Sequence, residues 1–183
     1  MGDVSRNLLA APFEDAYWVD PGRFMAGPHP GGGSAEATRA RTASLLEAGI
    51  LCAINLTEPH EEKQEDRYED VLSALASDRG LEAACARFAL WDGTSPSPAA
   101  VKELLDVIDA CLARDMPVYL HCKVGLGRTG VMVGCWLVRH GVARPRAAVR
   151  HISKLRRHAA TARITSPSTR EQIARVRSWK PGM

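Results

Sequence analysis

Five residues separate Cys122 from Arg128 in the stretch HCKVGLGRTG, which runs from His121 to Gly130. A guanidinium is a planar donor that can hold two oxygens of a phosphate, and a thiolate facing that phosphate is a nucleophile already in position. Thiols near helix N-termini and cationic groups have pKa values of roughly 3.5–7.5, against about 8.5 for a free thiol. We therefore expect Cys122 to ionise easily and to attack phosphorus, with the Thr129 hydroxyl donating to its sulfur.

Two apolar runs indicate the elements that hold this stretch. Residues 117–120 predict a buried strand and residues 131–138 predict a helix, so the stretch is a loop between them. Glycines in the loop permit positive φ, which turns consecutive N–H groups toward one tetrahedral anion, and the helix N-terminus adds further donors. Phosphate or sulfate is expected to fit this loop. The expected binding residues are Lys123, Val124, Gly125, Leu126, Gly127 and Arg128.

The same stretch resembles the signature loop of the cysteine-dependent dual-specificity and protein tyrosine phosphatases, His-Cys-x-x-Gly-x-x-Arg-Ser/Thr-Gly, and matches all six fixed positions. The resemblance is specific here and moderate at residues 91–98. It implies that Cys122 forms a phosphorylated intermediate, that Arg128 holds the phosphate oxygens, and that His121 supports the loop. It implies no metal and no cofactor.

Cleavage of a phosphate ester also needs an acid that protonates the leaving oxygen. In this family the acid is an aspartate on a mobile loop some thirty residues before the cysteine. Asp92 stands thirty residues before Cys122, after a predicted strand at 86–90 and within a Gly/Ser/Pro-rich loop at 91–98. The resemblance therefore implies that Asp92 is the acid; the alternative is an ordinary turn aspartate.

Three further residues carry weaker resemblances, and an ordinary structural role stays open for each. His29 lies in a segment similar to the opening hairpin of these phosphatases and could line the pocket, or it is a plain loop histidine. Gln172 could place the water for the second step, or it is a helix-surface residue. Cys52 could be a resolving thiol for Cys122, since related phosphatases keep one on a neighbouring strand, or it is core packing.

Composition and charge narrow the class of protein. The 183 residues lack an apolar run of membrane-spanning length, and the N-terminus lacks a signal-peptide pattern. Five cysteines form an odd set without close spacing, which favours a reducing cytoplasm. The net charge is +3, but residues 1–138 carry −8 and residues 139–183 carry +11. The basic part is either a solvated surface or a field that steers anionic substrates.

Hydrophobic periodicity predicts an α/β fold, with a central, mostly parallel sheet flanked by helices as in dual-specificity phosphatases. Residues 1–15 are a possible loose arm, and residues 16–183 form a single catalytic domain. The acidic run from Glu58 to Asp70 is expected to be a solvated surface. Ser34 and Ser168 are expected helix caps. Strands are predicted at 16–19, 23–27, 50–56, 86–90 and 117–121, and helices at 35–48, 67–79, 99–113, 129–140, 145–158 and 168–179.

Together these features predict a phosphomonoesterase of the dual-specificity type, acting on phosphotyrosine and phosphoserine/threonine in a protein or on a small phosphoester. An inositol or lipid phosphatase is a rival, but Lys123 is the one lysine in the loop and Leu126 stands where lipid phosphatases carry a second. An RNA 5′-phosphatase would use the basic part, where Trp179 is the one stacking aromatic after Trp136, so nucleic acid is not expected. A non-catalytic phospho-binding module would be expected to lack the Cys, the Arg or the Asp.

Overall fold

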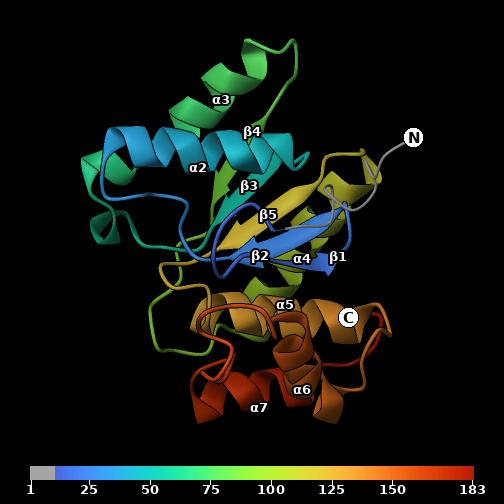
Figure 1. Cartoon of the computed structure of the whole chain (residues 1–183). Helices are drawn as coiled ribbons and strands as arrows, with labels where there is room; N and C mark the ends of the chain where they lie inside the picture. Colours follow the sequence, from blue (N-terminus) through green and yellow to red (C-terminus); the bar gives the residue numbers. More distant parts are fainter. Residues whose placement is uncertain (1–10) are drawn as a thin grey trace.

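The computed structural model describes residues 11–183, so the first ten residues of the predicted arm lie outside the described part. Five strands form one sheet in the order β1-β2-β5-β3-β4 (Figure 1). The β1–β2 pair is antiparallel, whereas the β2–β5, β5–β3 and β3–β4 pairs are parallel, which confirms the predicted mostly parallel sheet. The strands are β1 Tyr17–Asp20, β2 Phe24–Gly27, β3 Cys52–Asn55, β4 Ala84–Arg87 and β5 Val118–His121.

Helices cover both faces of the sheet (Figure 1). Helices α2 and α3 pack on one face, where their apolar residues join Tyr119 of β5 and Ala53 of β3. Helices α4 and α5 pack on the other face, and α6 and α7 pack against α5 beyond it. The helices are α2 Ala35–Glu47, α3 Glu69–Ser77, α4 Pro98–Ala113, α5 Gly127–Arg139, α6 Pro145–Leu155 and α7 Arg170–Ser178.

Strand β5 is the centre of the molecule because it is hydrogen-bonded on both sides and buried along its whole length. A parallel strand between two helical layers must be apolar on both faces, and Val118, Tyr119 and Leu120 meet that requirement. The strand delivers His121 and Cys122 to its carboxyl end, where ligands bind in open α/β sheets.

Several predicted boundaries shift in the structure. Strand β4 begins two residues before the predicted strand and ends three residues earlier, on the exposed edge of the sheet where hydrophobicity is a weak guide. Ser34 caps α2 as expected, but Thr169 caps α7 in place of Ser168, through a reciprocal pair of bonds with Gln172. The acidic run contains two short 3₁₀ turns, Pro59–Glu61 and Gln64–Asp66, before α3 begins.

Residues 11–15 form no helix or strand. The Phe13 ring packs edge-on against Tyr119 at 5.9 Å between centroids, and the Asp15 carboxylate accepts hydrogen bonds from the backbone and hydroxyl of Thr161. These contacts join this segment to the sheet and to the connection between α6 and α7.

Candidate active site

The loop between β5 and α5 begins at Cys122 and wraps against the β2 end. The backbone N–H of His29 donates to the Lys123 carbonyl at 3.1 Å. Gly125 has φ of 77°, and a Cβ there would lie 2.5 Å from the Gly27 carbonyl oxygen, so glycine is required on two counts. The expectation of a positive φ at Gly127 is wrong, because this residue is the first residue of α5. A Cβ at this position would lie 3.1 Å from the Gln172 amide nitrogen, so the absence of a side chain lets Gln172 approach.

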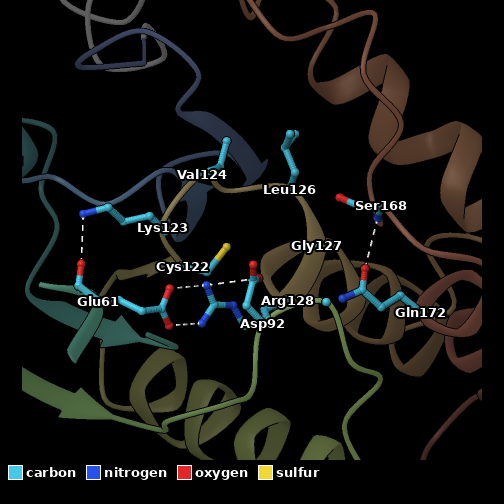
Figure 2. Close-up of a pocket in the computed structure, with 11 residues that line it drawn as sticks. Glu61, Asp92, Cys122, Lys123, Val124, Leu126, Gly127, Arg128, Ser168 and Gln172 are labelled. Atoms are coloured by element: carbon cyan, nitrogen blue, oxygen red, sulfur yellow. Dashed lines mark hydrogen bonds and ion pairs between the residues drawn. The ribbon is translucent and has the colours of Figure 1, made fainter. Parts of the chain in front are cut away.

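A cavity of about 260 Å³ opens at this loop (Figure 2). The three residues predicted for the chemistry, Cys122, Arg128 and Asp92, all line it. Gly125 does not, so its part is to let the backbone turn. The other lining residues are Glu61, Gly93, Lys123, Val124, Leu126, Gly127, Ser168 and Gln172.

Arg128 is 1% exposed and its guanidinium is held by Glu61, which sequence analysis missed. The two terminal nitrogens donate to the two Glu61 carboxylate oxygens at 2.5 and 2.8 Å, and one of them lies 3.2 Å from Asp92 (Figure 2). The hydrogen bond from Arg128 lowers the pKa of Glu61 below its usual range. The Arg128 guanidinium, which was predicted to hold two phosphate oxygens, thus holds the two carboxylate oxygens of Glu61. The buried Nε of Arg128 has no hydrogen-bond partner within residues 11–183.

The acidic run is only in part the solvated surface that was expected, because Glu65 and Asp70 are exposed but other acids of the run turn inward. The Glu62 side chain is 2% exposed and accepts from His29 at 2.8 Å, Asn55 at 2.5 Å and Arg87 at 2.6 Å. Burial alone would raise the pKa of Glu62, but these hydrogen bonds hold it well below its usual range. Asp66 is also buried and accepts from the Gly33 backbone. The run folds inward because its charges find buried donors.

His29 does not line the cavity, so that hypothesis is wrong. Its Nδ1 accepts from the Gly31 backbone N–H at 2.9 Å, which places the proton on Nε2, and Nε2 donates to Glu62. The ring stands nearly perpendicular to His121, at 4.9 Å between centroids. His29 therefore packs beneath the loop.

His121 is fully buried, and burial lowers its pKa well below the usual value, so the ring is neutral at pH 7. Its Nδ1 lies 3.3 Å from the Cys122 carbonyl, which can only accept, so Nδ1 carries the proton. Its Nε2 then accepts from the Tyr68 hydroxyl at 2.7 Å. Tyr68 thus fixes the tautomer through which His121 supports the loop.

Helix α7 holds the loop that carries Asp92. The Gln172 amide donates to the Thr94 carbonyl at 3.0 Å, and Arg175 donates to the Pro96 carbonyl at 3.0 Å. Gln172 is fully buried, so its placement on the helix surface is wrong. Its amide oxygen accepts from the backbone of Ser168 and Thr169, at 3.1 and 3.2 Å.

Two other loop residues differ from expectation. The Thr129 hydroxyl is buried and has no hydrogen-bond partner in the described part of the chain, so the expected bond to the Cys122 sulfur is not formed. The Lys123 ammonium turns toward the acidic run, where it donates to the Glu61 carbonyl at 3.1 Å and lies 3.9 Å from Asp66. Its charge is therefore partly neutralised at the rim of the cavity.

The hypothesis that Cys52 is a resolving thiol for Cys122 is wrong, and the alternative of core packing fits the structure. Cys52 pairs in register with Val118, four residues before Cys122, so the two cysteines lie about 13 Å apart along the strands. Disulfide Cα atoms must come within about 7 Å. The Cys52 sulfur instead lies 3.3 Å from that of Cys111 on α4.

The fold and this loop define a cysteine-based phosphatase of the dual-specificity and protein tyrosine phosphatase class. Residues 29–142 match the family described as "Polymorphic toxin system, DSP-PTPase phosphatase", and the chain belongs to that family. Part of the chain is 31% identical over 137 residues to dual specificity protein phosphatase CDC14C of Symphalangus syndactylus, and 28% identical over 135 residues to CDC14A of Homo sapiens. Each match covers 69% of this chain, but only 24% and 20% of those relatives.

Solved structures share the fold at low sequence identity. PTPMT1 in complex with PI(5)P has a TM-score of 0.66 at 19% identity, covering 90% of this chain and 93% of that one. TpbA of P. aeruginosa in complex with pTyr has a TM-score of 0.63 at 16% identity, covering 93% and 87%. Within residues 11–183, no group of three or more His, Cys, Asp or Glu side chains is placed to hold a metal ion. No helix in that range is long and apolar enough to cross a membrane.

Glu61→Gln is expected to lower the free energy of unfolding by about 1–3 kcal/mol, because it removes the charged partner of the buried Arg128. Inorganic phosphate should restore more stability to this variant than to the wild type, since the anion replaces the missing charge. Thermal melts with and without phosphate would measure both effects. Glu65→Gln is the matched control, because Glu65 is exposed. Equal phosphate stabilisation of the variant and the wild type would contradict the assignment.

The same substitution should change the pH dependence of stability. The folded pKa values of Glu61 and Glu62 are lowered, so their contribution is complete above the unfolded value of about 4.3 and is lost as pH falls toward the folded values. Denaturant titrations between about pH 6 and pH 3 should show a shallower decline for Glu61→Gln than for the wild type. An unchanged slope would show that Glu61 is not paired in solution.

Proposed function

We propose that the chain is a phosphomonoester hydrolase of the dual-specificity protein phosphatase type, acting through a cysteinyl-phosphate intermediate. The observation that carries the proposal is the meeting of Cys122, Arg128 and Asp92 in one cavity of about 260 Å³. These are the nucleophile, the oxyanion donor and the acid that the reaction requires. An odd set of cysteines favours a reducing compartment such as the cytoplasm.

In the first step, the Cys122 thiolate attacks phosphorus while the ester P–O bond breaks. Asp92, as the carboxylic acid, gives its proton to the leaving oxygen, which departs as an alcohol or phenol. Arg128 and the loop amides hold the equatorial oxygens, and the unpaired Nε of Arg128 is an available donor for one of them. The Asp92 side chain is 73% exposed, so it stands where a leaving group would exit.

In the second step, water attacks the phosphorus of the S–P intermediate and the Asp92 carboxylate accepts its proton. The S–P bond breaks, and Cys122 leaves as a thiolate with phosphate as the product. The Thr129 hydroxyl is a buried donor without a partner in residues 11–183, and we propose that it stabilises this leaving thiolate.

The surroundings of the cavity favour a protein substrate over a polyanionic lipid or inositol headgroup. The Lys123 ammonium is engaged by the Glu61 carbonyl and faces Asp66, so it is a poor second phosphate ligand. An RNA 5′-phosphatase would need aromatic side chains that stack on bases near the basic residues 139–183. Trp136 and Trp179 are only 5% and 2% exposed, so they cannot stack on bases, and this activity is disfavoured.

Purified protein should hydrolyse phosphotyrosine and phosphothreonine peptides, and EDTA should leave the rate unchanged because no step uses a metal. The assay compares these peptides with a phosphoinositide and a 5′-triphosphorylated RNA, and acid quenching with radiolabelled substrate should trap phosphate on Cys122. Turnover confined to the lipid or the RNA would replace the proposed substrate class. A loss with EDTA that added metal restores would point to a different chemistry.

A further inference from the structure

Three arginines line a hollow on the outer surface of α6 and α7. Arg146 comes from the first turn of α6, while Arg170 and Arg177 come from α7, which also contributes Ala174 and Ser178 to the lining. The hollow measures about 660 Å³. All three arginines are exposed, and none forms an ion pair with a carboxylate in the described part of the chain. We call this hollow the arginine groove.

The arginine groove lies in a part of the chain that is strongly positive. Residues 139–183 carry 12 Lys/Arg and one acid, Glu171. Glu171 lines a neighbouring hollow with Ser95 and Arg175 and is not among the residues of the groove. Unpaired guanidiniums on a positive background favour an anionic ligand, and carboxylates match their fork geometry.

The arginine groove is joined to the candidate active site through α7. Ser168, which precedes this helix, and Gln172, in its first turn, line the catalytic cavity. Arg170 is the first residue of the helix and lines the arginine groove. Arg177 lies seven residues further on, about 10 Å along the axis at 1.5 Å per residue. An extended peptide covers that length in about three residues.

We propose that the arginine groove binds an acidic stretch of the substrate protein, with Asp or Glu side chains about three to six residues from the phosphorylated residue. The inference rests on the proposed function, because it needs a protein substrate. A peptide fits better than single-stranded nucleic acid, since the groove is lined by arginine, alanine and serine and offers no aromatic face to a base.

The test uses two phosphotyrosine peptides of equal length, one with Asp at three to six residues on both sides of the phosphotyrosine and one with Ser and Gln there. The wild type should show kcat/KM about 3- to 10-fold higher for the acidic peptide, with the difference shrinking as salt is raised. Hydrolysis of neither peptide would reject the proposed function. Hydrolysis of the neutral peptide without an acidic preference would reject the arginine groove alone.

The double variant Arg146→Glu/Arg177→Glu should abolish or reverse the acidic preference. Its kcat/KM for the neutral peptide and for a phosphorylated phenol should stay within about twofold of the wild type, which also shows that it folds. Arg39→Glu/Arg41→Glu is the matched control, with the same charge change at exposed positions of α2, on the other face of the sheet.

Two results would overturn the proposal. An equal loss of preference in the control and the groove variant would make the effect one of net charge. A groove variant that keeps its acidic preference but loses binding to a single-stranded RNA or to anionic phospholipid vesicles would assign the groove to that other partner.

Discussion

Cys122→Ser is expected to lower kcat by about 10⁴-fold or more, because a serine hydroxyl at this position does not ionise at neutral pH and Cys122 is the one thiol among the described residues that line the cavity. Phosphate binding should persist, since Arg128 and the backbone of the loop are unchanged. Turnover of a phosphorylated phenol measures the first effect, and isothermal calorimetry with inorganic phosphate measures the second.

The matched control is Cys85→Ser, which changes an exposed cysteine on the edge strand β4 and should leave the rate unaltered. Residual activity in Cys122→Ser above the level of a mock purification would reject the nucleophile assignment. Loss of phosphate binding together with turnover would instead indicate a collapsed loop.

Asp92→Asn is expected to slow hydrolysis of a phosphoserine or phosphothreonine peptide by about 10²- to 10⁴-fold, the range of general-acid catalysis. A phosphorylated phenol with a strongly acidic leaving group should be affected much less, because its oxygen departs without a proton. The alkaline limb of the pH–rate profile should also disappear in the variant. Steady-state rates across a leaving-group series at several pH values would measure both effects.

Asp78→Asn is the control for this experiment, because Asp78 is at the end of α3, away from the cavity. A uniform slowing of all leaving groups would show that Asp92 acts on the shape of the loop and not as the acid. An alkaline limb that survives in Asp92→Asn would show the same.

The sequence predicted the sheet, the helices α2 to α7 and the loop between β5 and α5, because each depends on local signals. A buried parallel strand must be apolar throughout, as β5 is, and the positions of Cys122 and Arg128 follow from the loop between it and α5. Asp92 was found through its distance from Cys122 and the resemblance, and the structure brings it to the same cavity.

The inward turn of the acidic run could not be predicted in the same way. Glu61 and Glu62 are neighbours in an ordinary charged segment, and their partners Arg128, Arg87 and His29 come from distant parts of the chain. A charge run is solvated unless such partners exist, and sequence spacing alone does not reveal them. Motif matching therefore located the groups that we propose to react, but not the group that holds Arg128.

The register of β3 with β5 and the rotation of α7 about its axis explain two other predictions that were wrong, those for Cys52 and Gln172. The resemblance placed Cys52 on the strand beside β5, which is right, but the parallel register sets it opposite Val118. Gln172 follows a polar segment that is typical of a helix surface, yet α7 docks on Gly127 and the Thr94 carbonyl and buries it.

The hydrogen bonds from α7 to the Asp92 loop have a consequence for how far this chain can be shortened. A fragment limited to residues 29–142, the range of the family match, would contain Cys122, Arg128 and Asp92. It would lack the Gln172 and Arg175 anchors of the acid loop, and it would lack β2, which flanks β5. Proteolytic removal of the last forty residues is therefore expected to abolish the proton donation that we propose for Asp92, even where the signature loop keeps its shape.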